Sequence, residues 1–372
     1  MVAGVRVLVV NAGTGSVRVR LVDGDGTVRG RADVAADRGR PAPGAVERAV
    51  RRIGGADAVG HRIVHGGAVF TGPVAVDDTV LAELDRLVTL APLHQPPGLA
   101  ALRATTAVLP GVPAVACFDT AFHAGLPAPA ATYAVPASWR ERLGVRRYGF
   151  HGLAHEWAAR RVAELVGPGR RTVVAHLGSG ASLCAVAWVD GRPCPVDTTM
   201  GATPTAGLVM GSRCGDLDPA VPLWLVEHAG MAVGDVAAAL DRASGLAGLA
   251  GSADMREVLA AEAAGRPEAA LAVAVWLHRL RAGVAAMAAA LGGLDALVFS
   301  GGIGEHAAGL RARAVAGLRF LGPELDPDAN AAARPGCDTD LGAPGAAVRT
   351  LVVHAREDRV VADQVRSVLA PP

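Results

Sequence analysis

The sequence of 372 residues contains no lysine: all 36 of its cationic side chains other than histidine are arginine. This absence excludes a phosphate-binding loop that ends in Gly-Lys-Ser/Thr, a Schiff-base lysine and the catalytic lysine of protein kinases. Any phosphate chemistry of this chain must therefore rely on arginine, on backbone amides and on a metal ion.

Aromatic residues and cysteines are also scarce. Aromatic residues make up 3% of a sequence that is 51% hydrophobic and rich in Ala and Val, which favours a compact α/β protein with many helices. The cysteines are odd in number and form no C-x-x-C pair, so we expect reduced thiols, a cytoplasmic location and no metal cluster. They are Cys117, Cys184, Cys194, Cys214 and Cys337.

The sequence has neither a large excess of one charge nor an unbroken apolar run of membrane-spanning length. The net charge is +1 and acids and bases are mixed, so we expect no nucleic-acid partner and no membrane partner. The longest apolar stretch, residues 269–293, is interrupted by His278, Arg279 and Arg281, which predicts a buried helix. The N-terminal "MVAGVRVLVVNAG" leads directly into a strand and has no signal-peptide pattern.

A glycine-rich turn between two strands occurs twice. Residues 9–26, "VVNAGTGSVRVRLVDGDG", align without a gap with residues 174–191, "VAHLGSGASLCAVAWVDG". In each copy an apolar strand leads into Gly-[Ser/Thr]-Gly, a second strand follows, and Asp-Gly then signals a further hairpin turn. No helix follows the glycine turn, unlike in a P-loop or a dinucleotide-binding motif. Because the chain is also long for a single core, we predict two domains of common plan.

Strands alternate with helices along the rest of the chain, which predicts an α/β fold with mixed sheets. In the first half, helices are predicted at 45–53, 80–90 and 97–108, and strands at 58–65 and 112–119. In the second half, a loop-rich stretch at 192–219 precedes amphipathic helices up to 291, strands at 294–300 and 348–355, and a helix from Glu357.

Polar side chains of chemical interest stand in a few apolar segments. Arg62 lies in "GHRIVHGG", an otherwise apolar strand, so unless it lies at an edge it must be paired or bind an anion. Asp119 ends the strand in "FDTAFH", where α/β proteins bind ligands, although an N-cap for the next helix is an equal alternative. His151 and His155 have the spacing of zinc ligands on a helix, but no third ligand follows, so we do not expect zinc.

Two further segments are unusually rich in glycine, which indicates a close approach of backbone to a ligand. Residues 197–219, "DTTMGATPTAGLVMGSRCGDLDP", contain Arg213 near Asp216 and Asp218. The segment "FSGGIGEHAAG" is a strand, turn and helix of the kind that places a nucleotide against the backbone, although any such turn can carry Gly-Gly.

Eight segments together resemble the acetate kinase family in their order and spacing, over almost the whole chain. They are "NAGTGSVRVRL", "GHRIVHGG", "LAPLHQPP", "FDTAFH", "YGFHG", "HLGSGAS", "DTTMGATPTAGLVMGSRCGDLDP" and "SGGIGE". This family belongs to the acetate and sugar kinase/heat-shock ATPase/actin superfamily. The resemblance implies an α/β fold of two duplicated domains of the ribonuclease H-like/actin-like ATPase type, with a nucleotide cleft between them. This agrees with the repeated hairpin.

The resemblance also implies domain limits. The N-terminal domain would comprise residues 1–120 and 359–372, with the first phosphate hairpin and the acyl-substrate residues. The C-terminal domain would comprise residues 121–358, with the second hairpin and the adenosine site.

The implied reaction is the reversible transfer of the γ-phosphoryl group of ATP to acetate, giving acetyl phosphate and ADP. The resemblance further implies ATP/ADP as co-substrate, Mg²⁺ (or Mn²⁺ in its place) and a homodimer. A close alternative is a propionate or other short-chain acyl kinase on the same scaffold. A distant one is a nucleotide-driven clamp or a polyphosphate hydrolase of the same superfamily, but a clamp has no need for Arg62, Arg213 and an apolar acyl pocket.

By similarity, the catalytic residues are Arg62, Asp119, His151 and Arg213. The two arginines would hold the acetate carboxylate and the moving phosphoryl group, since guanidinium groups suit a transition state spread over equatorial oxygens. His151 would donate a hydrogen bond to that group, and Asp119 would orient Arg62 and the substrate. Acetate, with a pKa of roughly 4, is already an anion at pH 7, so Asp119 need not act as a general base.

The resemblance assigns binding roles to further residues. Asn11 and Glu357 would position Mg²⁺ through water, and His94 and His176 would line the cleft. The acetate methyl group would lie against Val64, Leu93, Phe150 and Pro204. The nucleotide would bind Arg18, His176, Gly178, Ser179, Gly180, Asp254, Met255, Arg256, Gly301, Gly302, Ile303, Gly304 and Glu305.

The sequence departs from the family pattern on the nucleotide side. The first turn, usually a run of serines ending in lysine, here reads Thr14, Gly15 and Ser16, followed by Arg18. Asparagine is usual at the positions of Ser179 and His306. The preferred phosphoryl donor therefore stays open.

Overall fold

The computed structural model describes residues 4–370 except 14, 38 and 93. The chain forms two compact units. Unit 1 comprises Met1–Ala124, Phe150–Trp157 and Arg356–Pro372, and unit 2 comprises Gly125–Gly149 and Ala158–Ala355. Unit 1 includes residues 121–124, 150–157 and 356–358, which lie in the predicted C-terminal domain.

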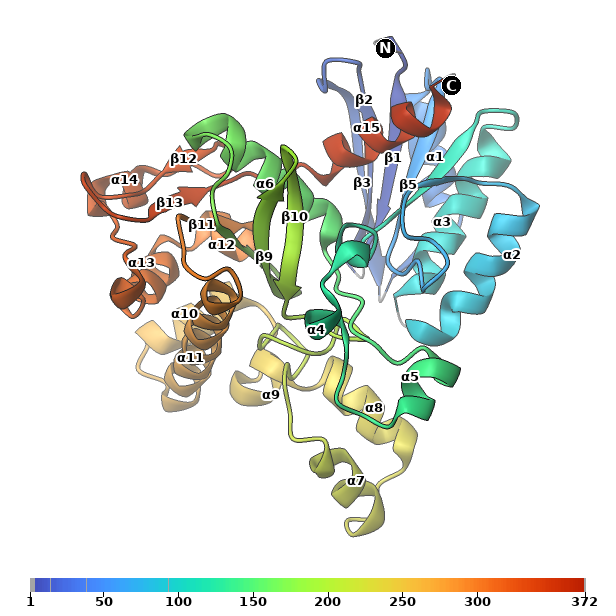
Figure 1. Ribbon diagram of the computed structural model, residues 1–372. Helices are drawn as coiled ribbons and strands as arrows, with labels where there is room; N and C mark the ends of the chain where they lie inside the picture. Colours follow the sequence, from blue (N-terminus) through green and yellow to red (C-terminus); the bar gives the residue numbers. More distant parts are fainter. Residues whose placement is uncertain (1–3, 14, 38, 93, 371–372) are drawn as a thin grey trace. The chain divides into compact units, whose positions relative to one another are not determined.

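Unit 1 is built on one mixed sheet (Figure 1). Its first two strands form the predicted antiparallel hairpin, and its first strand also lies parallel to β5, which lies parallel to β7. In spatial order the strands are β4 (Arg40–Pro41), β3 (Val28–Asp37), β2 (Ser16–Val22), β1 (Val7–Ala12), β5 (Ala58–Ile63), β7 (Ala114–Phe118) and β6 (Val74–Ala75).

Helices cover both faces of this sheet. The buried side chains of β2, Val17, Val19 and Leu21, form a core with α1 (Ala45–Ile53) and α3 (Gln95–Val108). The opposite face packs on α15 (Glu357–Leu369), drawn in red in Figure 1, which begins at the predicted residue. Unit 1 also contains α2 (Asp78–Arg86), the 3-10 helix η1 (Leu87–Leu90) and the first turns of α6 (Gly152–Val166).

Unit 2 repeats the strand order of unit 1. Strands β8 and β9 form the second antiparallel hairpin, and β8, β11 and β13 are parallel. Without the two-residue strands, the main strands of both sheets lie in the order third, second, first, fourth, fifth. The predicted common plan is thus confirmed. In spatial order the strands are β10 (Arg192–Thr198), β9 (Ala181–Val189), β8 (Thr172–Leu177), β11 (Ala296–Ser300), β13 (Arg349–Val352) and β12 (Thr339–Asp340).

Strand β10 corrects the predicted loop at 192–219 over its first seven residues. It pairs with β9 through a tight turn at Asp190 and Gly191, whose φ angles are 50° and 73°, as a hairpin turn of the Asp-Gly type requires. Pro193 and Pro195 obscured the strand, but β10 is an edge strand, where proline removes no ladder bond.

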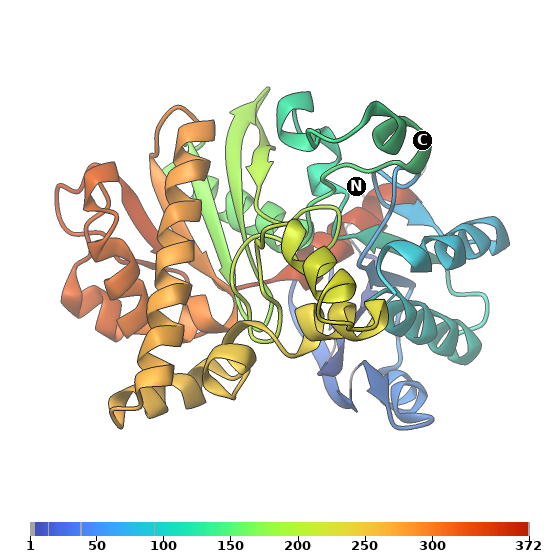
Figure 2. The ribbon, with the colours of Figure 1, turned by 90° about the horizontal axis from the view of Figure 1, so that it is seen from below.

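The long helix α11 (Pro267–Ala290) is buried on one face and exposed on the other. One face, including Val273, Trp276 and Leu280, packs on the sheet at β8 and β9, whereas Leu271 on the other face is 58% exposed. By length and composition alone α11 could cross a membrane. Figure 2 shows it in orange along the strands of unit 2. The prediction of a buried helix therefore holds for one face.

Apart from the remainder of α6, from Ala158 on, the other helices of unit 2 are short. They are α4 (Ala128–Ala131), α5 (Ala137–Leu143), α7 (Ala220–Glu227), α8 (Val233–Arg242), α9 (Gly245–Ala250), α10 (Met255–Ala263), α12 (Gly301–His306), α13 (Ala308–Ala316) and α14 (Pro327–Ala332), with the 3-10 helix η3 (Arg319–Leu321). A further 3-10 helix, η2 (Phe122–Gly125), ends at the first residue of unit 2.

Candidate functional site

Four polar side chains of unit 1 stand in a row across the sheet. Asn11 on β1 lies opposite Arg18 on β2 and opposite Arg62 on β5, and Arg62 lies opposite Cys117 on β7. Asp119 follows β7 by one residue. Because β1, β5 and β7 are parallel, the row marks the carboxyl ends of these strands, where open α/β sheets bind ligands.

Arg62 and Asp119 form a bidentate ion pair. Nε of Arg62 donates to Oδ1 of Asp119 at 2.9 Å, and Nη2 donates to Oδ2 at 2.5 Å. The side chains are only 15% and 2% exposed. Burial alone would lower the pKa of Arg62, but Asp119 and Glu357 together raise it. Burial raises the pKa of the Asp119 carboxyl, and Arg62 opposes this shift. Arg62 is therefore charged and held in a fixed plane.

Asn11 connects this pair to the first residue of α15. Its Oδ1 accepts from Nη1 of Arg62 at 3.2 Å, and its Nδ2 donates to Oε2 of Glu357 at 2.7 Å. An amide and a carboxylate are oxygen donors of the kind that Mg²⁺ prefers, and two such groups suit an ion that keeps most of its water. Among the described residues, no three His, Cys, Asp or Glu side chains gather as a metal cluster would require.

The start of α6 brings His151 to Asp119. The Gly152 amide donates to the Asp119 carbonyl oxygen at 2.9 Å. A Cβ atom on Gly152 would lie 2.2 Å from that same oxygen, so only glycine permits this approach. His151 itself has φ of 57°, a strained value for a residue other than glycine. Such strain is frequent at functional sites.

Buried histidines and Phe150 pack near His151. His123 Nε2 is 3.1 Å from the Phe150 carbonyl oxygen, and burial lowers the pKa of His123 to about 4, so its ring is neutral at pH 7. The Phe150 ring packs edge-on against His65, with centroids 5.3 Å apart. His155 lies between His123 and His151, at centroid distances of 5.7 and 6.5 Å.

Two residues that were not predicted from the sequence shape the loop after β5. Gln95 accepts from the His65 amide and donates to the His65 carbonyl oxygen, each at 3.0 Å, and the Thr120 hydroxyl accepts from the Gly66 amide at 3.0 Å. Both side chains are buried. A glutamine directly before Pro-Pro at the start of α3 was the available signal, but its partner lies 30 residues away.

In unit 2, the two glycine turns lie side by side. Gly178, Ser179 and Gly180 join β8 to β9, and Gly301 opens α12 directly after the neighbouring parallel strand β11. Gly301 has φ of 78°, and a Cβ atom on it would lie 2.8 Å from the Leu177 carbonyl oxygen. Gly302 and Ile303 continue α12.

The loop with Arg213 is tied to the first of these turns. The Gly211 amide donates to the Ser179 carbonyl oxygen at 3.0 Å, and the Met210 amide donates to the Arg213 carbonyl oxygen at 3.1 Å. Nη1 of Arg213 donates to the Pro204 carbonyl oxygen at 2.6 Å. The structure thus brings Arg213 and Pro204 together within unit 2.

The remaining predicted nucleotide residues differ in exposure. Asp254 caps α10 and pairs with Arg256, whereas Met255 is 4% exposed. His176 is half-buried on β8. Glu305 is buried, and its carboxylate accepts from Nδ1 of His354 at 2.8 Å and from the Ala355 amide at 3.1 Å. Burial raises the pKa of Glu305, but these hydrogen bonds outweigh it and the net shift is downward.

The predicted acyl-pocket residues lie in both units. Val64 and Phe150 belong to unit 1 and are 8% and 1% exposed, and Pro204 belongs to unit 2. Leu93 lies outside the described residues, as does Thr14 of the first turn. His94 precedes α3 and is half-buried, and Arg18 is exposed on β2.

Comparison with known proteins decides the family. The model of the acetokinase family matches residues 47–363. The chain belongs to the acetokinase family. An acetate kinase of Synechococcus sp. (strain JA-2-3B'a(2-13)) is 46% identical over 321 residues, which span 85% of this chain and 77% of that protein.

Solved structures agree with the fold. The crystal structure of Porphyromonas gingivalis acetate kinase has a TM-score of 0.87 and 33% identity, and covers 98% of this chain and 100% of that one. A propionate kinase from Francisella tularensis has a TM-score of 0.87 and 31% identity with the same coverage. The predicted fold class is confirmed.

Proposed function

We propose that this protein is an acetate kinase, a phosphotransferase with a carboxyl acceptor that moves the γ-phosphoryl group of ATP to acetate and back. The observation that carries the proposal is the buried, charged Arg62 held by Asp119 at the carboxyl ends of β1, β5 and β7, in a chain of the acetokinase family. In the forward direction an acetate oxygen attacks the γ-phosphorus, and the bond to the bridging oxygen of ADP breaks.

The state of Asp119 supports an acceptor that needs no deprotonation. Both of its carboxylate oxygens accept from the Arg62 guanidinium, which supports a role for Asp119 in fixing the orientation of that arginine. Acetate, with a pKa of roughly 4, needs no base at pH 7. The main electrostatic difficulty is the approach of two anions, which a fixed guanidinium reduces. Asp119 therefore acts as the residue that orients Arg62.

The other catalytic assignments rest on the family pattern together with local geometry. Arg62 and Arg213 would hold the carboxylate and the transferring phosphoryl group, and His151 would donate a hydrogen bond to that group. Asn11 and Glu357 would hold Mg²⁺ through water. When bound, the ion would neutralise charge on the nucleotide phosphates.

We assign the nucleotide to the glycine turns of unit 2. Gly178–Gly180 would contact the phosphates, and Gly301–Glu305 with Asp254 and Arg256 would surround the adenosine. Close packing of the two turns supports this assignment, because backbone without side chains can approach a ligand. ATP is the proposed donor, and the departures at Ser179 and His306 are reasons to test other nucleoside triphosphates as well.

The acyl pocket favours a short chain. Val64 and Phe150, two of the residues that the family pattern assigns to the acyl group, are almost fully buried in unit 1. One extra methylene is worth only about 1–3 kcal/mol of discrimination. Propionate is therefore expected to react more slowly rather than not at all. The likeness to a propionate kinase makes preference for propionate the second candidate function.

The test is a hydroxamate assay of the purified protein with ATP, Mg²⁺ and acetate, propionate or butyrate. We expect acyl phosphate from acetate at the highest kcat/KM, less from propionate and least from butyrate. A higher kcat/KM for propionate would favour the second candidate, and no acyl phosphate from any acid would refute the kinase proposal. We also propose a cytoplasmic homodimer, which light scattering of the purified protein would test.

A further inference from the structure

Arg311 is a buried cation on α13, and its side chain contacts the end of α12. It is 2% exposed and is the largest fully buried side chain among the described residues. Burial lowers its pKa from the usual value for arginine. A buried guanidinium is costly unless its donors are satisfied, so its partners indicate what it does.

Its hydrogen bonds go to neutral oxygens rather than to a carboxylate. Nη1 donates to the carbonyl oxygens of Gly304 at 2.9 Å and Glu305 at 2.8 Å. Nε and Nη2 donate to Oδ1 and the carbonyl oxygen of Asn330, at 2.9 and 3.0 Å. Within the part of the chain that the structure describes, no acidic side chain pairs with it. One planar group thus joins the end of α12 to α14.

The carbonyl groups of Gly304 and Glu305 lie near the end of α12, and helix ends leave such groups without partners inside the helix. Arg311 supplies that partner. Since α12 spans only six residues, Gly301–His306, fixing its end also fixes its start. Its start packs on the Leu177 backbone, next to Gly178 of the other glycine turn.

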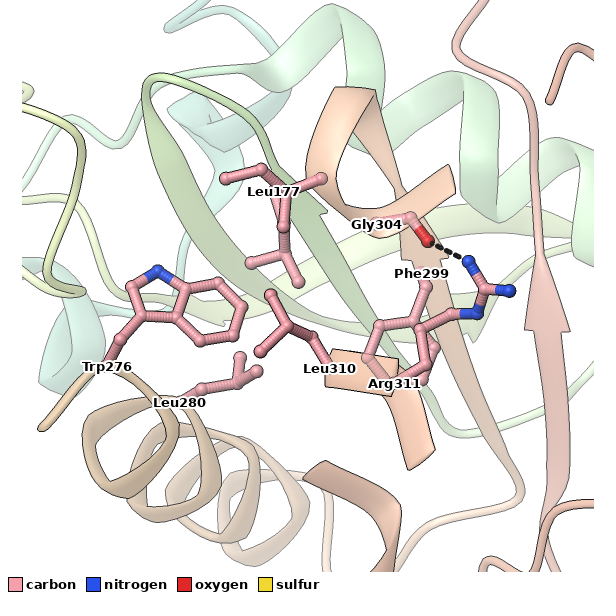
Figure 3. Close-up of a pocket in the computed structure, with 8 residues that line it drawn as sticks. Leu177, Trp276, Leu280, Phe299, Gly304, Leu310 and Arg311 are labelled. Atoms are coloured by element: carbon pink, nitrogen blue, oxygen red, sulfur yellow. Dashed lines mark hydrogen bonds between the residues drawn. The ribbon is translucent and has the colours of Figure 1, made fainter. Parts of the chain in front are cut away.

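The hydrogen bonds of Arg311 lie in buried surroundings. Figure 3 shows its chain beside Phe299, with the guanidinium directed at the Gly304 carbonyl oxygen. Leu177, Trp276, Leu280 and Leu310 close the remaining sides of a small apolar pocket. Because Arg311 is only 2% exposed, its hydrogen bonds are shielded from water, and shielded hydrogen bonds are stronger than exposed ones.

We propose that Arg311 is a positioning residue for nucleotide binding: its planar guanidinium holds the end of α12 and thereby sets the position of the helix residues Gly301–Glu305. This rests on the proposed function, which assigns those residues to the nucleotide. Lysine is not equivalent here, because it carries the charge but not the planar fork. The proposal therefore separates the geometry of Arg311 from its charge.

The test compares Arg311→Lys and Arg311→Met with Arg313→Met. Arg313 lies on the same helix, is exposed and pairs with Glu262, so it is a matched control. Binding of ADP with Mg²⁺ is measured by calorimetry, and amide hydrogen exchange is measured on peptides that cover 301–306 and α11. We expect both Arg311 variants to raise the Kd for ADP about tenfold or more, with faster exchange at 301–306 and unchanged exchange in α11. The KM for acetate should stay within about twofold of wild type, as should every value for the control.

Three outcomes would overturn the proposal. The first is an ADP Kd within about twofold of wild type for both variants. The second is wild-type binding by Arg311→Lys alone, which would mean that charge suffices. The third is faster exchange throughout unit 2, which would indicate a general role in stability.

A fourth variant and the wild type complete the design. If Arg311→Met does not fold, Asn330→Ala removes one acceptor, and a smaller rise in Kd is expected; no rise would count against the clamp. A wild-type protein that binds ADP but forms no acyl phosphate would refute the proposed reaction and leave this test intact. A wild type that does not bind ADP would overturn both.

Discussion

Replacing His61 with leucine should make unit 1 less sensitive to acid. His61 stands on β5, where side chains alternate between faces, so it shares the face of Val59 and Ile63 and points away from Arg62. It is 1% exposed, and neither ring nitrogen has a hydrogen-bond partner among the described residues. Burial lowers its pKa from 6.5 to about 3.

The size of the effect follows from this shift. Between pH 6.5 and 3 the unfolded chain binds a proton at His61 that the folded chain does not, so stability falls as the pH falls. The fall is about 1.4 kcal/mol for each pH unit below 6.5, or about 2 kcal/mol between pH 7 and 5. The leucine variant lacks this contribution. It also removes two ring nitrogens without partners, so it should be at least as stable as wild type at pH 7.

The assay is urea unfolding at pH 7, 6 and 5, followed by pulsed hydrogen exchange of peptides from β1 and β5, which reports on unit 1 alone. His278→Leu, on the exposed face of α11, is the matched control. We expect wild type and control to lose about 2 kcal/mol more than His61→Leu between pH 7 and 5. Equal losses in wild type and His61→Leu would refute the reasoning, because they would show that the folded protein accommodates the charged ring.

Two further predictions concern the site. Gly152→Ala places a Cβ atom 2.2 Å from the Asp119 carbonyl oxygen, so we expect the free energy of unfolding to fall by about 1–3 kcal/mol and kcat to be much lower. The control Gly309→Ala adds a Cβ atom in open space on α13 and should change neither value. A wild-type kcat in Gly152→Ala would contradict the close packing. Asp119→Asn should keep more kcat/KM in the hydroxamate assay than Arg62→Ala or Arg213→Ala, since Asp119 orients an arginine and takes no proton; equal abolition by all three would argue against this role.

The local patterns of this sequence predicted its elements well. The alternation of Val17, Val19 and Leu21 predicted β2, and the helix at 45–53 has the predicted bounds. The alternation and the glycine spacing also predicted the first hairpin. Its repeat in unit 2 predicted the common strand order. The prediction of a loop from residue 192 was wrong for β10, because an edge strand tolerates prolines such as Pro193 and Pro195 and a central strand does not.

Contacts between distant segments could not be predicted from local sequence patterns. The sequence suggested that Arg62 needs a partner, but the bidentate pair with Asp119 spans 57 residues and depends on the register of β5 and β7. The strained backbone of His151 directly precedes Gly152, which packs on the Asp119 carbonyl oxygen, and no local pattern indicates either feature. The Arg311 clamp likewise depends on the folded position of Asn330 on α14, and no motif marks it.

In the proposed reaction the γ-phosphoryl group goes to a carboxylate and not to water. The most direct measurement follows ADP release and acetyl hydroxamate formation together, in the wild-type protein with ATP, Mg²⁺ and acetate. The expected result is one acetyl phosphate for each ADP, with little ADP when acetate is omitted. ADP release without acyl phosphate would contradict it, because the protein would then be a nucleotide-driven clamp or a hydrolase.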